Sequence, residues 1–177
     1  MVERNHVIIT GPVNSGKTTL LYALYSRLDS LGKSIGGISQ VMPLPHKIKT
    51  DWVWSDQGSG ETHVLMSTEQ HDDWKIFKRF WYNQSTFDWA SALLLKQRSQ
   101  YEVLTVDEIG PIELSGGGLH DAYSTILHTY NGLLITVVRD NLLEEVLSYF
   151  GINKDDVLLI HSQKEKESEL RKVVPVE

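Results

Sequence analysis

A glycine-rich loop near the start of the chain constrains the fold more than any other stretch. Residues 7–10, Val-Ile-Ile-Thr, are apolar and partly β-branched, which predicts a buried parallel strand. Residues 11–18 read Gly-Pro-Val-Asn-Ser-Gly-Lys-Thr and match the pattern of Gly, four residues, then Gly-Lys-Thr. Leucines recur on one face of residues 19–31, which predicts an amphipathic helix. A strand, a glycine loop and a helix in this order are typical of an α/β fold.

This loop has the composition that phosphate binding requires. Its glycines let backbone N–H groups turn inward around phosphate oxygens, and the following helix adds the positive end of its dipole. We expect Lys17 to reach the β- and γ-phosphates and the Thr18 hydroxyl to hold Mg²⁺. An ordinary glycine-rich turn with an exposed lysine is the alternative interpretation. The candidate nucleotide-binding residues are Gly11, Pro12, Val13, Asn14, Ser15, Gly16, Lys17, Thr18 and Thr19.

Composition narrows the class of protein. The chain has 177 residues, and we expect one domain over residues 1–177 with a core of useful size. The net charge of −6 at pH 7 provides no global basic field, so generic binding to nucleic acid is not expected. The chain has no cysteine, which excludes disulfides and thiolate metal sites and fits a reducing cytosol.

Targeting signals are not visible in the sequence. The first predicted strand begins by residue 7, which leaves no room for a signal peptide. No apolar run approaches the length of a membrane span. We therefore expect a cytoplasmic protein without a membrane partner.

The segment after the first helix predicts an inserted β-hairpin region at about 43–82. Gly36 and Gly37 fall in the strand before it, and paired glycines indicate a close approach to a neighbouring backbone. Pro43 and Pro45 end that strand. The expected elements are a strand at 34–42, a strand at 47–55, a turn at 56–60 and a strand at 62–66.

All the tryptophans lie in this region or just after it. We favour the interpretation that they pack a small sheet against the nucleotide-binding core. The alternative is an aromatic surface for a base or a protein partner. Residues 74–82 are aromatic and basic, and we interpret them as one strand. The tryptophans are Trp52, Trp54, Trp74, Trp81 and Trp89.

The second half alternates helices and strands, which indicates a parallel α/β sheet interrupted by the antiparallel insertion. Pro111 and the glycines at 116–118 indicate a flexible loop. We expect helices at about 85–98, 119–130 and 141–150, and strands at 101–106, 133–138 and 157–160.

Local signals suggest where these helices begin. Ser85 with Asp88, and Asn141 with Glu144, are candidate capping boxes. The charged residues 162–177 predict a frayed helix or a tail.

Two carboxylates, Asp107 and Glu108, end the strand predicted at 101–106. In a parallel sheet, ligands bind beyond the carboxyl ends of the strands. Asp107 can then contact the Mg²⁺ shell, directly or through water. Glu108 can orient and deprotonate an attacking water. A solvated acidic turn is the alternative, and the phosphate-binding loop in the same chain argues against it.

Together these motifs resemble a known family, the small nucleoside-triphosphatases that include the cancer-related nucleoside triphosphatase. The matching parts are the loop, the Gly36-Gly37 strand, the hairpin and residues 107–114, Asp-Glu-Ile-Gly-Pro-Ile-Glu-Leu. The acidic motif of that family reads Asp-Glu-Ile-Gly, two residues, then Glu-Leu. The resemblance covers about residues 5–160. It implies Mg²⁺-dependent hydrolysis of nucleoside triphosphates with loose base preference, on a three-layer P-loop fold with a RecA-like, mainly parallel sheet.

The chain departs from the family pattern in two places. The family usually carries a hairpin with an arginine and a Gly-Phe pair after the paired glycines, whereas this chain has Lys47 and Lys49 nearby. The family usually has His-Arg after the strand at 133–138, where this chain has Val138 and Arg139. Arg139 is a candidate for stabilising a transferring phosphate, and a surface arginine is the equal alternative.

Two short sequence motifs are similar to motifs found in GTPases. Residues 107–110 match Asp-x-x-Gly, and residues 153–156 match the guanine-reading string Asn-Lys-x-Asp. The second string precedes a predicted strand, although a guanine-reading motif should follow one. We therefore interpret residues 153–156 as a turn between a helix and a strand.

Two other functions remain open. A small-molecule, nucleoside or nucleotide kinase uses the same loop, but between residues 50 and 130 only Arg79 and Arg98 could supply an arginine lid. A nucleotide-gated binding module would use the tryptophan-rich segment 52–89 to meet a partner.

Overall fold

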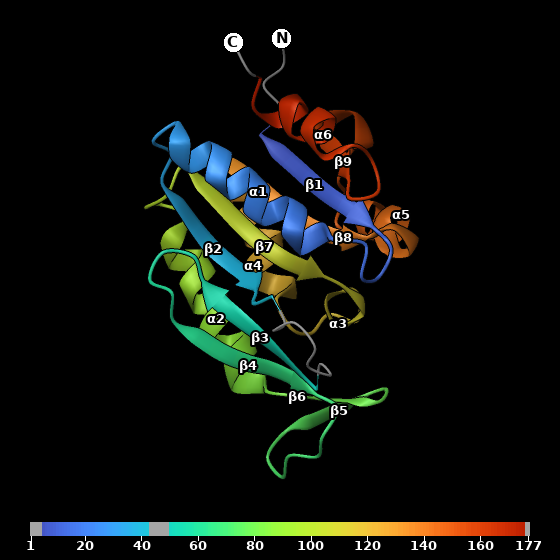
Figure 1. Cartoon of the computed structure of the whole chain (residues 1–177). Helices are drawn as coiled ribbons and strands as arrows, with labels where there is room; N and C mark the ends of the chain where they lie inside the picture. Colours follow the sequence, from blue (N-terminus) through green and yellow to red (C-terminus); the bar gives the residue numbers. More distant parts are fainter. Residues whose placement is uncertain (1–4, 43–49, 176–177) are drawn as a thin grey trace.

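One sheet of nine strands organises the part of the chain that the computed structural model describes, residues 5–42 and 50–175 (Figure 1). Its parallel strands are β1 (His6–Gly11), β2 (Ile35–Gln40), β7 (Val103–Ile109), β8 (Leu133–Arg139) and β9 (Leu158–His161). Its antiparallel strands are β3 (Asp51–Asp56), β4 (Thr62–Ser67), β5 (Lys75–Phe77) and β6 (Phe80–Tyr82). The order across the sheet is β5-β6-β4-β3-β2-β7-β8-β1-β9.

Helices cover both faces of this sheet, so the molecule has three layers (Figure 1). One face carries α1 (Lys17–Ser30) and α6 (Lys166–Val173). The other carries α2 (Gln84–Gln97), α3 (Pro111–Leu114), α4 (His120–Thr129) and α5 (Leu143–Tyr149). Within the described ranges, no helix combines the length and the apolar character that crossing a membrane requires.

The alternation of side chains along β1 explains why both faces are covered. Val7 and Ile9 pack in the core beneath α1, whereas Ile8 between them packs in the core on the other face. All three are almost completely buried. Successive strand residues point to opposite faces, so a strand that is apolar at every position needs a helical layer on each side. The expected mixed α/β sheet with a parallel core is confirmed.

Strand order determines what meets at the carboxyl edge of the sheet. β8 pairs in parallel with both β1 and β7, and therefore lies between them. The end of β1 carries the glycine loop, and the end of β7 carries the two carboxylates. Arg139 ends β8 and so lies between these two features.

The paired glycines of β2 bring that strand close to its neighbours. A Cβ atom built on Gly37 would lie 2.1 Å from the backbone oxygen of Thr105 on β7. A Cβ atom on Gly36 would lie 2.7 Å from the ring of Tyr101. No side chain fits at those distances, so the close approach predicted from the glycines is confirmed.

The inserted region is larger than one hairpin. β3 and β4 form the predicted hairpin, with a register shift between Trp52 and Val53. Residues 74–82, predicted as one strand, form the second hairpin β5–β6, because Lys78 adopts a left-handed turn conformation with φ of 55°. Pro43, Pro45, Lys47 and Lys49 lie outside the described residues.

Two predicted helix caps are wrong. The side chain of Asn83, rather than that of Ser85, caps α2 by accepting a hydrogen bond from the Ser85 N–H at 3.0 Å. The predicted cap at Asn141 is replaced by a 3-10 turn, Asp140–Leu142, which runs into α5. An N-cap residue needs non-helical backbone angles, and the sequence pattern alone does not fix which of several nearby polar residues adopts them.

Two segments are more ordered than predicted. Pro111 begins the short helix α3 instead of a flexible loop, because proline suits the first turn of a helix. The charged residues after 162, predicted as a frayed helix or a tail, form the ordered helix α6, since Leu170 and Val174 are buried in the core with α1. Glu165 caps this helix through the backbone N–H groups of Glu167 and Ser168.

Candidate functional site

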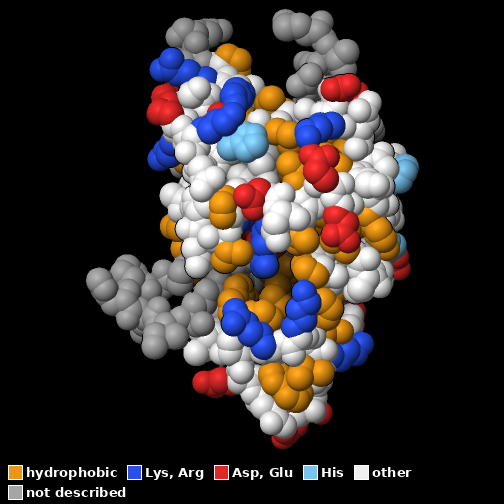
Figure 2. Space-filling model, turned by 90° about the vertical axis from the view of Figure 1, so that its right-hand side faces the viewer, with side chains coloured by type: hydrophobic (Ala, Val, Ile, Leu, Met, Phe, Trp, Pro, Cys, Tyr) orange, Lys and Arg blue, Asp and Glu red, His pale blue; other side chains and the backbone are white. Residues whose placement is uncertain are grey.

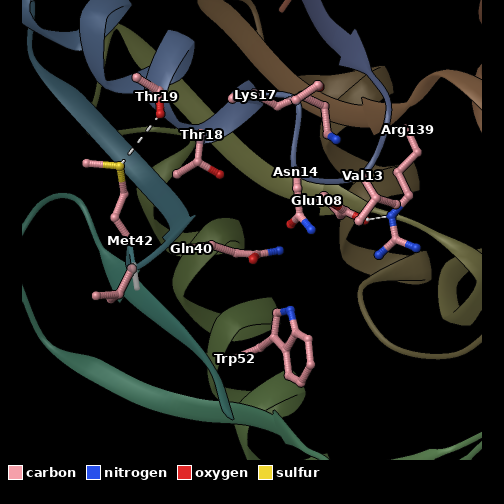
Figure 3. Close-up of a pocket in the computed structure, with 13 residues that line it drawn as sticks. Val13, Asn14, Lys17, Thr18, Thr19, Gln40, Met42, Trp52, Glu108 and Arg139 are labelled. Atoms are coloured by element: carbon pink, nitrogen blue, oxygen red, sulfur yellow. Dashed lines mark hydrogen bonds and ion pairs between the residues drawn. The ribbon is translucent and has the colours of Figure 1, made fainter. Parts of the chain in front are cut away.

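A cavity of about 280 Å³ lies at the carboxyl edge of the parallel strands (Figure 2). The glycine loop and the first turn of α1 form one wall of it, and residues from β2, β3, β7 and β8 complete it (Figure 3). The structure thus brings together motifs that are far apart in the sequence. The lining residues are Val13, Asn14, Ser15, Gly16, Lys17, Thr18, Thr19, Gln40, Val41, Met42, Trp52, Glu108 and Arg139.

Lys17 lies folded against its own loop. Its Nζ donates hydrogen bonds to the backbone oxygens of Gly11 at 3.1 Å and Pro12 at 2.6 Å. Burial lowers the pKa of Lys17, and the nearby Glu108 carboxylate opposes that shift. The ammonium group is therefore held at the cavity wall by carbonyl oxygens. Lys17 is buried, whereas the alternative interpretation of the loop expected an exposed lysine.

Asp107 is the most deeply buried acidic group of the cavity region. Its Oδ2 accepts hydrogen bonds from the Gln40 backbone N–H at 3.1 Å and from the Thr18 hydroxyl at 3.4 Å. Its Oδ1 is buried and has no hydrogen-bond partner within the described ranges. Burial, followed by the charge of Glu108, raises the pKa of Asp107 to about 7.

These oxygens fit a divalent cation. Mg²⁺ binds hydroxyl and carboxylate oxygens, commonly through one or two protein ligands together with phosphate oxygens and water. The unpartnered Oδ1 of Asp107 next to the Thr18 hydroxyl provides that kind of incomplete oxygen set. Across residues 5–42 and 50–175, no cluster of three or more His, Cys, Asp or Glu side chains forms a site that could hold a metal without such additional ligands.

Trp54 supports this acidic strand end, a role that the sequence analysis missed. Its indole Nε1 donates a hydrogen bond of 2.6 Å to the backbone oxygen of Asp107. Its ring is 1% exposed and packs edge-on against Phe87, with ring centroids 5.2 Å apart. The alternation of apolar residues in β3 signals that Trp54 is buried, but nothing in the sequence indicates its partner.

Glu108 forms an ion pair with Arg139. Glu108 Oε1 lies 2.6 Å from Arg139 Nε (Figure 3). The pairing of β7 with β8 shifts by one residue here, since Asp107 pairs with Val137 and Ile109 pairs with Val138. Glu108 is thus left out of the strand ladder, and such irregularities redirect a side chain next to active sites.

The opposite wall of the cavity is partly apolar. It includes Met42 and Trp52, and the Thr19 hydroxyl lies 3.9 Å from the Met42 sulfur (Figure 3). The Trp52 ring also contacts Phe80 of the second hairpin, with ring centroids 5.0 Å apart. These two tryptophans therefore have different environments. Trp54 packs in the core, as the favoured interpretation expected, whereas Trp52 lines the cavity.

Ser15 and Asn153, which belong to the predicted motifs, each make one side-chain hydrogen bond outside the cavity lining contacts described above. The Ser15 and Ser162 hydroxyls lie 2.5 Å apart, which joins the glycine loop to the end of β9, a contact that the sequence analysis missed. The Asn153 side chain accepts a hydrogen bond from the Asp155 N–H and caps the 3-10 turn Lys154–Asp156. That turn precedes β9, at the strand end opposite to Ser162, so it lies away from the cavity.

Comparisons with known proteins identify relatives of this chain. Residues 6–174 match the model of a family described as NTPase. The protein named nucleoside-triphosphatase THEP1 from Methanothermobacter thermautotrophicus is 27% identical over 143 residues, which cover 79% of each chain.

Two solved structures share the fold. The crystal structure of THEP1 from Aquifex aeolicus gives a TM-score of 0.71 at 20% identity and covers 96% of both chains. The solution structure of a human cancer-related nucleoside triphosphatase gives a TM-score of 0.72 at 20% identity, covering 96% of this chain and 95% of that chain.

Proposed function

This chain belongs to the NTPase family, and we propose that its glycine loop, Asp107, Glu108 and Arg139 together hydrolyse nucleoside triphosphates. The family match and the nucleoside-triphosphatase relative support an enzyme of this class. The observation that carries the proposed site is the meeting of the glycine loop with Glu108 and Arg139 in one cavity. The resemblance noted from the sequence motifs is confirmed.

The loop is proposed to bind the phosphates. Backbone N–H groups at the start of α1 and the dipole of this helix attract negative charge. Lys17 supplies a full positive charge at the same place, and its hydrogen bonds to the oxygens of Gly11 and Pro12 keep it at the cavity wall. A triphosphate entering the cavity offers the Lys17 ammonium stronger, charged acceptors than those two carbonyl oxygens.

Thr18 and Asp107 are proposed to hold Mg²⁺. The Thr18 hydroxyl and the unpartnered Asp107 Oδ1 are the oxygen atoms available for it. When bound, the ion neutralises charge on the β- and γ-phosphate oxygens. Ionised Asp107 is required for this role, and a nearby cation lowers the pKa of a carboxyl group.

Glu108 and Arg139 are proposed to act on the phosphate that reacts, Glu108 as a base and Arg139 as a positive charge. A carboxylate that lines the cavity can accept a proton from an attacking water molecule. A guanidinium group beside it can stabilise negative charge that develops on the transferring phosphoryl group. The two side chains form an ion pair, so a phosphate group in the cavity would compete with Glu108 for Arg139.

The proposed domain organisation is supported by the sheet, and the proposed location and partners are supported by the composition. The described strands all lie in one sheet, which supports a single nucleotide-binding domain over residues 1–177. A cytoplasmic location and the lack of generic nucleic-acid binding are proposed from the cysteine-free, acidic composition.

The test is phosphate release from ATP, GTP, CTP and UTP, with Mg²⁺ and with EDTA. We expect release that requires the metal. We also expect the kcat/KM values of ATP and GTP to agree within about two orders of magnitude, or about 3 kcal/mol, because phosphates supply most charged contacts. Failure to hydrolyse any triphosphate would contradict the proposal, and a strict requirement for GTP would contradict the loose base preference.

A further inference from the structure

A smaller cavity of about 60 Å³ lies next to the phosphate-binding cavity. The two cavities have a wall in common, and this wall carries the ion pair of Glu108 and Arg139 (Figure 3). A small molecule in the smaller cavity is therefore placed beside the proposed base. The residues that line both cavities are Gln40, Trp52, Glu108 and Arg139.

The wall of the smaller cavity combines apolar and polar side chains. The apolar side chains belong to the core and include Trp54, Leu65 and Phe87. A buried water molecule needs about two to four polar partners and about 10–15 Å³ of space, and this cavity offers both. It is therefore suited to one or more water molecules. The polar side chains of the wall are Gln40, Glu108, Glu113 and Arg139.

Glu113 is the carboxyl group of this wall that does not line the phosphate-binding cavity. It is 3% exposed, and its two oxygens accept hydrogen bonds from the backbone N–H groups of Gly110 at 2.9 Å and Leu119 at 3.2 Å. A Cβ atom built on Gly118 would lie 2.3 Å from Glu113 Oε1, so the loop after α3 closes tightly over the carboxyl group. These contacts fix the position of Glu113 at the cavity wall.

The Glu113 carboxyl group can still bind water. An ionised carboxylate has about four acceptor sites on its two oxygens, which is more than two backbone N–H groups occupy. The guanidinium of Arg139 is a donor, and the carboxylates of Glu108 and Glu113 are acceptors. Water both donates and accepts hydrogen bonds, so it is the small molecule that matches this mixture of groups.

We propose that the smaller cavity supplies the water for hydrolysis, and that Glu113 is a positioning residue that anchors this water beside Glu108. The attacking water oxygen forms a bond to the γ-phosphorus, and one of its protons passes to the Glu108 carboxylate. The bond from that phosphorus to the bridging oxygen breaks, and its electron pair leaves with the nucleoside diphosphate. Glu113 acts only through the water that it holds. This inference rests on the proposed function of the triphosphate site.

Variants of Glu113 test its role in the reaction. Glu113→Ala should lower kcat by about 10²-fold, because a small misplacement of a reactant costs that much. The Kd of a non-hydrolysable ATP analogue with Mg²⁺ should stay unchanged, since Glu113 does not line the triphosphate cavity. Glu113→Gln keeps the shape and still bonds to water, so it should recover part of the loss. Phosphate release per nucleotide-binding site measures kcat independently of partial unfolding.

Ser115→Ala is the matched control for an effect on the loop alone. The Ser115 hydroxyl donates a hydrogen bond of 2.7 Å to the backbone oxygen of Ile112 in the same segment, but Ser115 does not line the cavity. We expect this variant to keep the kcat of the wild type. A decrease in kcat equal to that of Glu113→Ala would assign Glu113 a structural role and overturn the inference.

A second pair of variants changes the space for water without changing a charged group. Leu65→Phe should fill part of the smaller cavity and lower kcat, with the Kd of the ATP analogue unchanged. Leu93 on α2 packs against the same core but does not line the cavity, so Leu93→Phe should leave kcat unchanged. Equal kcat values for these two variants would contradict the inference.

A crystal structure with Mg²⁺ and a non-hydrolysable ATP analogue tests the water directly. We expect ordered water bonded to Glu113 and to Glu108, and less of it in Leu65→Phe. A cavity without water, or a Glu113→Ala variant with the kcat of the wild type, would overturn the inference and leave the hydrolase proposal intact. A joint loss of kcat and nucleotide binding in Glu113→Ala would also overturn it. A wild type that hydrolyses no triphosphate would overturn both proposals.

Discussion

Glu108 at the end of β7 and Arg139 at the end of β8 form an ion pair, with Oε1 and Nε 2.6 Å apart, beside the glycine loop. Their side chains are 16% and 36% exposed, so the pair is only partly shielded from water. Its net stabilisation is small for that reason, at about 0–1 kcal/mol. The pair matters more for how it orients two groups that the proposed reaction needs.

The first prediction concerns Arg139. Arg139→Ala removes the positive charge next to the transferring phosphate, and kcat should fall by about 10²–10³-fold. Arg139→Lys should recover part of this loss, because it keeps the charge but lacks the planar fork of the guanidinium. Steady-state kinetics with ATP measures both. A kcat of Arg139→Ala close to that of the wild type would show that Arg139 only anchors Glu108.

The second prediction concerns Glu108. Glu108→Gln cannot accept a proton from water, so turnover should fall by about 10²–10⁴-fold. The affinity for Mg²⁺ and ATP should stay the same or increase, since one negative charge near the phosphates is removed. Calorimetric titration and phosphate release measure the two quantities.

Asp107→Asn is the matched control for this variant. It should raise the Mg²⁺ concentration needed for activity, whereas Glu108→Gln should not. If Glu108→Gln hydrolyses ATP at the wild-type rate, Glu108 is not the base. If its binding collapses together with its activity, Glu108 has a structural or metal-binding role.

The third prediction concerns Lys17. Lys17→Ala should abolish turnover and weaken triphosphate binding, because charge on the β- and γ-phosphates is no longer neutralised. The variant should still fold, with a loss of stability of about 1 kcal/mol, since the oxygens of Gly11 and Pro12 lose a donor but lie beside an open cavity. Thermal unfolding and nucleotide titration provide the measurements, and wild-type activity would remove the loop from the mechanism.

The fourth prediction concerns Glu113 and pH. Its carboxylate accepts hydrogen bonds from the backbone N–H groups of Gly110 and Leu119, yet burial raises its pKa from an ordinary value of 4.5 to about 7. The folded state therefore binds more protons than the unfolded state between these values. The stability from Glu113 is fully present below pH 4.5 and is lost as the pH rises through about 7, by on the order of 3 kcal/mol.

Glu113→Gln tests this sign. Chemical unfolding at pH 5 and at pH 8 should show a smaller decrease in stability for Glu113→Gln than for the wild type. Asp107 also has a pKa raised to about 7, so the decrease should become smaller rather than vanish. An identical decrease in both proteins would contradict the assignment to Glu113.

Local sequence patterns predicted the elements that we propose to bind phosphate. The glycine loop between an apolar strand and an amphipathic helix identified residues 11–18, and the apolar run before Asp107 identified the acidic strand end. These signals can be recognised in the sequence because hydrophobic periodicity and glycine positions are local features that span only a few residues. The helix caps were predicted wrongly and the turn at Lys78 was missed, since both depend on backbone angles at single positions.

The α/β class, the glycine loop and the order of the motifs along the chain could be read from the amino-acid sequence alone. The contacts between distant residues come from the three-dimensional packing: Glu108 pairs with Arg139, Trp54 bonds to the backbone of Asp107, and Trp52 lines the cavity. These contacts join different strands, and they depend on strand order and register. A shift of one residue turns a strand side chain to the other face, so such contacts follow from the packing of the whole sheet rather than from any local pattern.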